Sequence, residues 1–279
     1  MGSFLCPPGY ARPKGVRALA REGSVVTEAA RYVSRSASDR LHRGETAHAL
    51  PARDRGQSAV ILVPGFMAGD LSLALLSRHL RRLGHRTYRS SIWANVGCTR
   101  QAGEDLERRI EAIAEKRGRR VSIVGHSLGG LIGRGVAARR PDLVEGLVTL
   151  GSPILAPGAS HAVLQWDVAV LVRLHRAGLC VMGEDCTSGE CARDSWEQAR
   201  LPLAADIEFT SVFSRRDGIV DWRSCLDPQA QTVEVSCSHL GMAFDPTAMD
   251  VIAQALHAAN EHRFSRAATL AEALDGAAG

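Results

Sequence analysis

The chain has 279 residues, of which 45% are hydrophobic and 5% aromatic, and its formal net charge is +4. This composition supports one large α/β domain or two small ones, and it excludes a wholly disordered chain. No apolar run reaches the ~18–20 residues that a membrane span needs, so we expect no stable membrane insertion. The net charge is too small to indicate nucleic-acid binding by itself, and we expect no nucleic-acid partner.

The number and spacing of the cysteines bear on where in the cell the protein is located. Seven cysteines are present, and an odd number leaves at least one thiol free or in an intermolecular bridge. Cys180, Cys186 and Cys191 are compatible with a disulfide, with free thiols or, lacking an evident fourth ligand, with a zinc site, while Cys225 and Cys237 are a second candidate pair. Residues 1–21 lack the continuous apolar stretch of a signal peptide, which favours a cytoplasmic location. A secreted or cell-envelope location stays open if a leader precedes this sequence or if the cysteines are bridged.

The first 57 residues are predicted to form an N-terminal extension. Residues 1–15 are rich in Pro and Gly, whereas residues 16–43 carry apolar side chains at roughly helical spacing. That spacing predicts one or two helices. Residues 45–58 are polar and are interpreted as a linker to the next domain.

From residue 58 to residue 262, strand patterns alternate with amphipathic helix patterns. The expected strands are 59–63, 86–92, 121–124, 144–150, 207–213 and 232–235, and the expected helices are 71–83 (with Asp70 as its N-cap), 100–117, 128–140 and 246–260. This alternation is typical of βαβ units and predicts an α/β fold with a mostly parallel, doubly wound sheet. Residues 154–203 interrupt the pattern and are predicted to form a helical cap insertion. Residues 263–279 follow as a C-terminal tail.

The strongest local motif is a match to G-x-S-x-G in the run Gly125-His126-Ser127-Leu128-Gly129-Gly130. A strand is expected before it and a helix after it, which places Ser127 on a sharp turn at the carboxyl end of the sheet. The glycines leave room for that turn, and the helix N-terminus favours developing negative charge near Ser127. Ser127 is therefore the candidate nucleophile, the alternative being a serine that only caps the helix.

Together these patterns resemble the α/β-hydrolase fold, and within it the bacterial serine lipase/esterase group, over about residues 59–260. The run Val63-Pro64-Gly65-Phe66-Met67 resembles the oxyanion loop of that group, although proline stands where many relatives have histidine. The resemblance implies that the backbone N–H groups of Phe66 and Leu128 form the oxyanion hole.

The resemblance also implies an acid after a late strand and a base before the last helix. Asp217 begins the run Asp217-Gly218-Ile219-Val220 and stands at the acid position. Asp221 is the alternative, and Asp217 is preferred because it lies nearer the end of the expected strand. His239 stands at the base position, while His126, within the turn that carries Ser127, is expected to point away from the nucleophile.

The order Ser127, Asp217, His239 predicts a serine carboxylic-ester hydrolase that cleaves acyl esters through an acyl-enzyme on Ser127. This chemistry requires no metal and no organic cofactor, and the expected partner is a small-molecule acyl ester or lipid. Candidate substrate-binding residues are Met67, Asn95 and Trp166, although Asn95 equally suits an Asx-turn. Apolar residues of the predicted cap either line an acyl pocket or pack the cap itself. An acyltransferase with the same triad and a non-catalytic binding protein with this fold are the alternatives.

Overall fold

The computed structural model of the chain describes residues 2–41 and 58–277. Most of the expected linker at 45–58 therefore lies outside the described residues. Six strands form one parallel sheet in the order β2-β1-β3-β4-β5-β6. Their bounds are Ala59–Val63 (β1), Arg86–Arg89 (β2), Val121–His126 (β3), Val144–Leu150 (β4), Glu208–Phe213 (β5) and Gln231–Glu234 (β6). The predicted α/β fold with a parallel sheet is confirmed.

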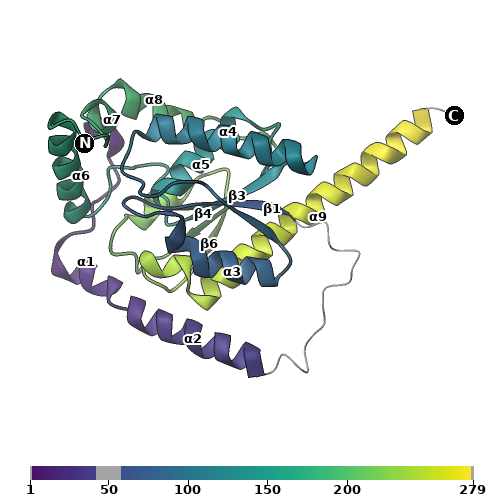
Figure 1. Cartoon of the computed structure of the whole chain (residues 1–279), viewed down its shortest axis with the longest axis horizontal. Helices are drawn as coiled ribbons and strands as arrows, with labels where there is room; N and C mark the ends of the chain where they lie inside the picture. Colours follow the sequence, from purple (N-terminus) through teal and green to yellow (C-terminus); the bar gives the residue numbers. More distant parts are fainter. Residues whose placement is uncertain (1, 42–57, 278–279) are drawn as a thin grey trace.

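Helices cover both faces of this sheet (Figure 1). Helices α4 (Thr99–Arg117) and α5 (Leu128–Arg139) pack on one face, where buried side chains such as Ile110 and Val136 meet the strands. Helices α3 (Ala74–Arg82) and α9 (Pro246–Ala277) pack on the other face. Because all strands are parallel, their carboxyl ends meet at a single edge, and loops that follow them can bring distant residues together.

Two expectations about these elements were wrong. The last helix, α9, continues to Ala277 instead of ending near residue 260, because the residues that follow include good helix formers and no Pro or Gly before Gly276. Asp70 does not cap the following helix: a short 3₁₀ turn, Asp70–Leu73, precedes α3, and the Asp70 carboxylate instead accepts hydrogen bonds from the backbone N–H groups of Ser90 and Ser91, each at 3.0 Å.

The segment before β1 and the segment between β4 and β5 are both helical. The N-terminal part contains the short 3₁₀ turn Ser3–Leu5, α1 (Gly15–Glu22) and α2 (Val25–Leu41). The segment between β4 and β5 contains α6 (Ala162–Arg176), α7 (Asp185–Ser188) and α8 (Glu190–Gln198), and we refer to residues 154–203 as the cap. Within the described ranges, no helix is long and apolar enough to cross a membrane.

A buried ion pair fastens α5 to the loop before β6. The Nε of Arg134 lies 3.1 Å from Asp227 Oδ2, and both side chains are buried. Removing one partner of such a pair leaves an uncompensated buried charge, so we expect Asp227→Ala to lower the free energy of unfolding by about 3–5 kcal/mol. Urea unfolding measures this loss, and a double variant Arg134→Met/Asp227→Ala is expected to recover part of it. A loss below about 1 kcal/mol in Asp227→Ala would contradict the importance of the pair.

Candidate active site

Ser127 occupies a strained turn between β3 and α5. Its backbone has φ 52° and ψ −121°, a conformation that non-glycine residues rarely adopt. Its N–H donates to the carbonyl of Leu150 at the end of β4, at 2.8 Å. A Cβ at Gly125 would lie 2.5 Å from the Cα of Gly130, and one at Gly129 would lie 2.3 Å from the carbonyl oxygen of Val63. The turn therefore requires both glycines, as expected for the motif.

Asp217 and His239 form a buried hydrogen-bonded pair. His239 Nδ1 lies 2.6 Å from Asp217 Oδ2. The other carboxylate oxygen, Oδ1, accepts from the backbone N–H groups of Ile219 at 2.8 Å and Val220 at 2.7 Å. These bonds fix the carboxylate and direct it at the imidazole, so the loop after β5 presents an oriented acid to the loop after β6.

Asp221, the alternative acid, lies in a different environment. Its carboxylate accepts from the backbone N–H of Ala11 at 2.8 Å and from the backbone N–H of Arg223 at 3.2 Å. Its side chain also pairs with the guanidinium of Arg223. Asp217, and not Asp221, is thus the carboxylate that contacts His239.

His126 braces the backbone at His239. Its Nε2 lies 3.0 Å from the carbonyl oxygen of His239, and the two rings lie 4.9 Å apart, centroid to centroid. Burial lowers the pKa of His126 to about 4, with a further contribution from the neighbouring His239. His126 is therefore uncharged at neutral pH and adds no positive charge beside His239.

Two buried glutamates from the N-terminal helices hold the loops of Asp217 and His239. Glu22, the last residue of α1, accepts through Oε1 from the N–H groups of Gly218 at 2.9 Å and His239 at 3.1 Å. Glu28 of α2 accepts from the backbone N–H of Ser238 at 2.8 Å and from its hydroxyl at 2.6 Å. Neither glutamate was predicted as part of the site, because no local sequence pattern links an acidic residue on an N-terminal helix to a group some 200 residues away.

The charge around His239 favours its protonated form. Burial alone would lower the pKa of His239, but the adjacent Asp217 carboxylate and, more weakly, the charge of Glu22 raise it above its ordinary value. Asp217 contacts the ring of His239 and His126 lies beside it, whereas Glu22 accepts from the backbone N–H of His239.

Two cavities meet at Ser127. One is lined by Ser127 and His239 together with Phe66 and Met67. The other, which we call the apolar cavity, is lined mainly by apolar side chains of the cap and of α5, and its walls include Leu5, Leu131, Val168, Met182 and Trp196. Ser127, Phe66 and Leu164 line both cavities, so both are adjacent to the serine.

Of the three predicted substrate-binding residues, one lines a cavity beside Ser127 and two do not. Met67 lines the cavity of Ser127 and His239. Trp166 is 67% exposed on α6 and lines neither cavity beside Ser127. Asn95 is buried and also lines neither, because its side-chain amide donates to the carbonyl of Pro64 at 2.9 Å. Asn95 thus braces the loop that carries Phe66. Of the apolar cap residues expected near the site, Leu164 reaches both cavities.

The backbone donors near Ser127 have distinct surroundings. In the loop after β1, the N–H of Met67 donates to the carbonyl of Asn95 and the N–H of Ala68 donates to the carbonyl of Gly65, so these two donors are already used. Leu128 is the first residue of α5, where N–H groups have no acceptor within the helix. Phe66 and Leu128 both line the apolar cavity beside Ser127.

Comparison with known proteins places this chain in a family. Residues 60–275 match the sequence model of the alpha/beta hydrolase family. The chain belongs to that family. A triacylglycerol lipase of Vibrio cholerae serotype O1 is 30% identical over 122 residues, a match that covers 41% of this chain and 39% of the lipase. The match thus spans only about two fifths of that relative.

Solved structures with the same fold are also similar to this hydrolase-family chain. The mature form of lipase BlEst2 from Bacillus licheniformis has a TM-score of 0.56 at 14% identity, over 70% of this chain and 90% of that one. A structure described as LipS and LipT, two metagenome-derived lipolytic enzymes, has a TM-score of 0.50 at 13% identity, over 74% and 94% of the two chains. At these identities the likeness concerns the fold.

Proposed function

We propose that this member of the alpha/beta hydrolase family is a serine carboxylic-ester hydrolase that acts on acyl esters. The single observation that carries the proposal is the arrangement at one sheet edge: Ser127 on a strained turn, with the hydrogen-bonded pair of His239 and Asp217 beside the same cavity. An oriented carboxylate, an imidazole and a serine are the parts that acyl transfer through a covalent intermediate requires.

In the proposed reaction, His239 takes the proton of the Ser127 hydroxyl as its oxygen attacks the ester carbonyl. The oxyanion of the tetrahedral intermediate accepts hydrogen bonds from the N–H groups of Phe66 and Leu128, whose positions support this role. His239 then protonates the leaving alcohol, and the acyl group stays on Ser127. Water repeats the sequence and releases the acid, while Asp217 holds the imidazole and stabilises its charged form.

The substrate class follows from the apolar cavity. Because most of its lining side chains are apolar, with Ser and Thr hydroxyls between them, an acyl chain is the part of an ester that suits it. The alcohol portion then faces the second cavity, where Met67 and the His239 side chain lie. The similarity to a triacylglycerol lipase agrees with an acyl ester substrate.

Hydrolysis of p-nitrophenyl esters from acetate to palmitate tests this proposal. We expect turnover with an optimum at one chain length, set by how much of the acyl chain the apolar cavity accepts. An assay with an added alcohol separates hydrolysis from acyl transfer, because a transferase passes the acyl group to the alcohol in preference to water. No release of p-nitrophenol from any ester would overturn the proposal, and release that depends on the added alcohol would favour an acyltransferase.

The raised pKa of His239 predicts the pH dependence of this activity. A protonated imidazole cannot accept the serine proton, so kcat/KM is expected to fall with decreasing pH, with a midpoint above the ordinary histidine value of 6.5. Glu22→Gln removes a negative charge that raises the pKa of His239, so its midpoint is expected to move to lower pH. The pH profile of kcat/KM for the two proteins measures this shift.

Glu28→Gln is the matched control for the Glu22 variant. Glu28 holds Ser238, the neighbour of His239, but it is not among the charges that shift the pKa of His239. We therefore expect Glu28→Gln to lower stability without moving the midpoint. If Glu22→Gln leaves the midpoint in place, or if both variants move it equally, Glu22 does not act on His239 through its charge.

A further inference from the structure

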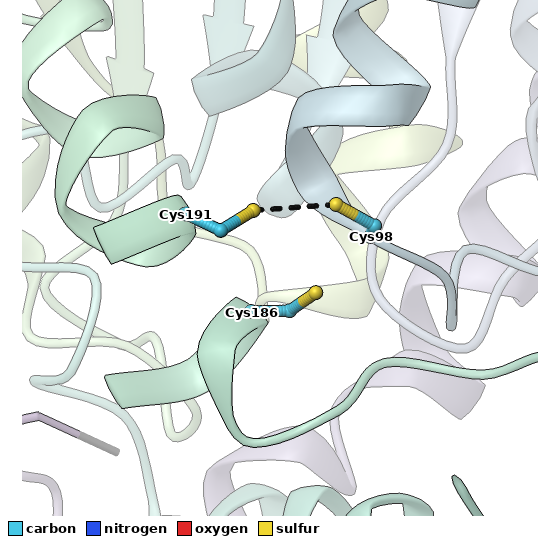
Figure 2. A group of neighbouring side chains, drawn as sticks. All are labelled: Cys98, Cys186 and Cys191. Carbon is cyan, nitrogen blue, oxygen red and sulfur yellow. Dashed lines mark hydrogen bonds between the residues drawn. The ribbon is translucent and has the colours of Figure 1, made fainter. Parts of the chain in front are cut away.

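Three cysteine side chains away from the His239–Asp217 pair converge on one point. The sulfur atoms of Cys98, Cys186 and Cys191 all lie within 4.8 Å of one another, and those of Cys98 and Cys191 lie 3.3 Å apart. Figure 2 shows the three side chains directed toward a common centre. The sequence grouped Cys180 with Cys186 and Cys191, but the exposed Cys180 lies outside this group, and Cys98 takes its place.

The three thiols come from two separate parts of the fold. Cys98 immediately precedes α4, which packs on the sheet. Cys186 belongs to α7 and Cys191 to the first turn of α8, and both are parts of the cap. Any bond that joins the three sulfurs therefore links the cap to the sheet domain across more than 80 residues of chain.

The number and spacing of the sulfurs favour a metal ion over a disulfide. A disulfide uses two sulfurs at about 2.0 Å, whereas here three are present, and those of Cys98 and Cys191 lie 3.3 Å apart. Zinc–sulfur bonds of about 2.3 Å in a tetrahedron place the sulfurs about 3.8 Å apart. That spacing lies within the 4.8 Å that limits all three pairs, and it is somewhat longer than the 3.3 Å between Cys98 and Cys191. Cysteine thiolates are preferred ligands of Zn²⁺.

The local charge also suits a thiolate-bound ion. Three thiolates carry three negative charges, of which a Zn²⁺ ion offsets two. Cys98 lies at the N-terminal end of α4, where the peptide dipoles favour the remaining negative charge, whereas the N–H of Cys191 at the start of α8 already donates to the carboxylate of Asp185. Cys191 is buried, while Cys98 and Cys186 are partly exposed, so an ion can enter from the side of the latter two.

We propose that Cys98, Cys186 and Cys191 bind one Zn²⁺ ion, with solvent in the fourth position, and that this ion fastens α7 and α8 of the cap to the start of α4. Cys186 and two chain neighbours of the site, Thr99 and Ala192, line the apolar cavity beside Ser127. The ion therefore fixes one wall of that cavity. The ion joins the cap to the sheet domain and takes no part in the proposed ester hydrolysis.

Zinc titration of the reduced, chelator-treated full chain tests this site. We expect one Zn²⁺ per chain, measured by elemental analysis after desalting, and a melting temperature that rises with zinc concentration. Cys98→Ser, Cys186→Ser and Cys191→Ser are each expected to weaken zinc binding by at least roughly 10–100-fold, the cost of losing a residue that only supports a ligand. Cys180→Ser is the matched control in the same cap segment, and it should bind zinc as the wild type does.

Cys186→Ser separates the zinc site from a disulfide. A Cys98–Cys191 disulfide would still form in that variant, would survive a chelator and would open only with a reductant. If Cys191→Ser fails to fold, Co²⁺ provides the readout, since Cys98→Ser and Cys186→Ser must weaken the sulfur-to-cobalt charge-transfer band. Zinc binding that is unchanged in these variants, or lost equally in Cys180→Ser, would overturn the proposal.

Discussion

Replacing Ser127 by alanine is expected to lower kcat for p-nitrophenyl esters by about 10⁵–10⁶-fold. The loss is this large because the serine oxygen forms the bond to the acyl group, and neither His239 nor the oxyanion donors can substitute for it. The rate that remains above that of the uncatalysed reaction in water comes from substrate binding and from the oxyanion donors alone. Because alanine and serine both carry a Cβ, the strained backbone of this turn costs about the same with either residue. The melting temperature of Ser127→Ala should therefore stay close to that of the wild type.

A second buried serine provides the control for this variant. Ser152 follows β4, as Ser127 follows β3, and it is fully buried with its hydroxyl directed at the carbonyl of Leu150. It lines neither cavity beside Ser127. We expect Ser152→Ala to retain its activity. A Ser127→Ala variant that keeps more than about a tenth of the wild-type kcat would contradict nucleophilic catalysis by this residue.

Asp217→Asn is expected to lower kcat by about 10⁴-fold. The asparagine amide keeps the shape of the side chain, but it can present an N–H to His239 Nδ1 where the carboxylate presents only acceptors. The imidazole is then held in the wrong tautomer and loses the charge that stabilises its protonated form. Steady-state kinetics with a short-chain p-nitrophenyl ester measures the loss, and the pKa of His239 should fall in the same variant.

Asp221→Asn tests the choice between the two carboxylates. Asp221 contacts the backbone of Ala11 and the side chain of Arg223 and makes no hydrogen bond to His239 in the described structure. Its replacement should therefore lower stability more than activity. A large loss of kcat in Asp221→Asn together with an active Asp217→Asn would reverse the assignment of the acid.

The sheet and the local turn could be predicted from the sequence because their signals are local. The run Ala59–Val63 is short, entirely apolar and ended by Pro64-Gly65, which favours a buried parallel strand, and the turn at Ser127 depends on glycines within two residues of it. The positions of Asp217 and His239 followed from their order relative to the strands and from the family resemblance. Their hydrogen bond is a consequence of the parallel topology, which brings successive strand ends to one edge.

The remaining features depend on contacts between distant segments, which a single sequence does not reveal. Glu22 meets Gly218 and His239 across about 200 residues, and its helix shows no pattern that marks a buried partner. Cys98 joins the cap cysteines although it lies 88 residues before Cys186 in the sequence. Asn95 suited a pocket position by its place after β2, yet its amide satisfies the carbonyl of Pro64, a requirement visible only once the loop is folded.

The most direct test of the account is to locate the covalent adduct that a fluorophosphonate leaves on the wild-type protein. The probe phosphonylates activated serines, so peptide mass spectrometry should find one adduct per chain, on the peptide that contains Ser127. Labelling should abolish ester hydrolysis in step with adduct formation, and Ser127→Ala should remain unlabelled. An unlabelled protein, or an adduct on another residue while Ser127→Ala still hydrolyses esters, would contradict the central role of Ser127.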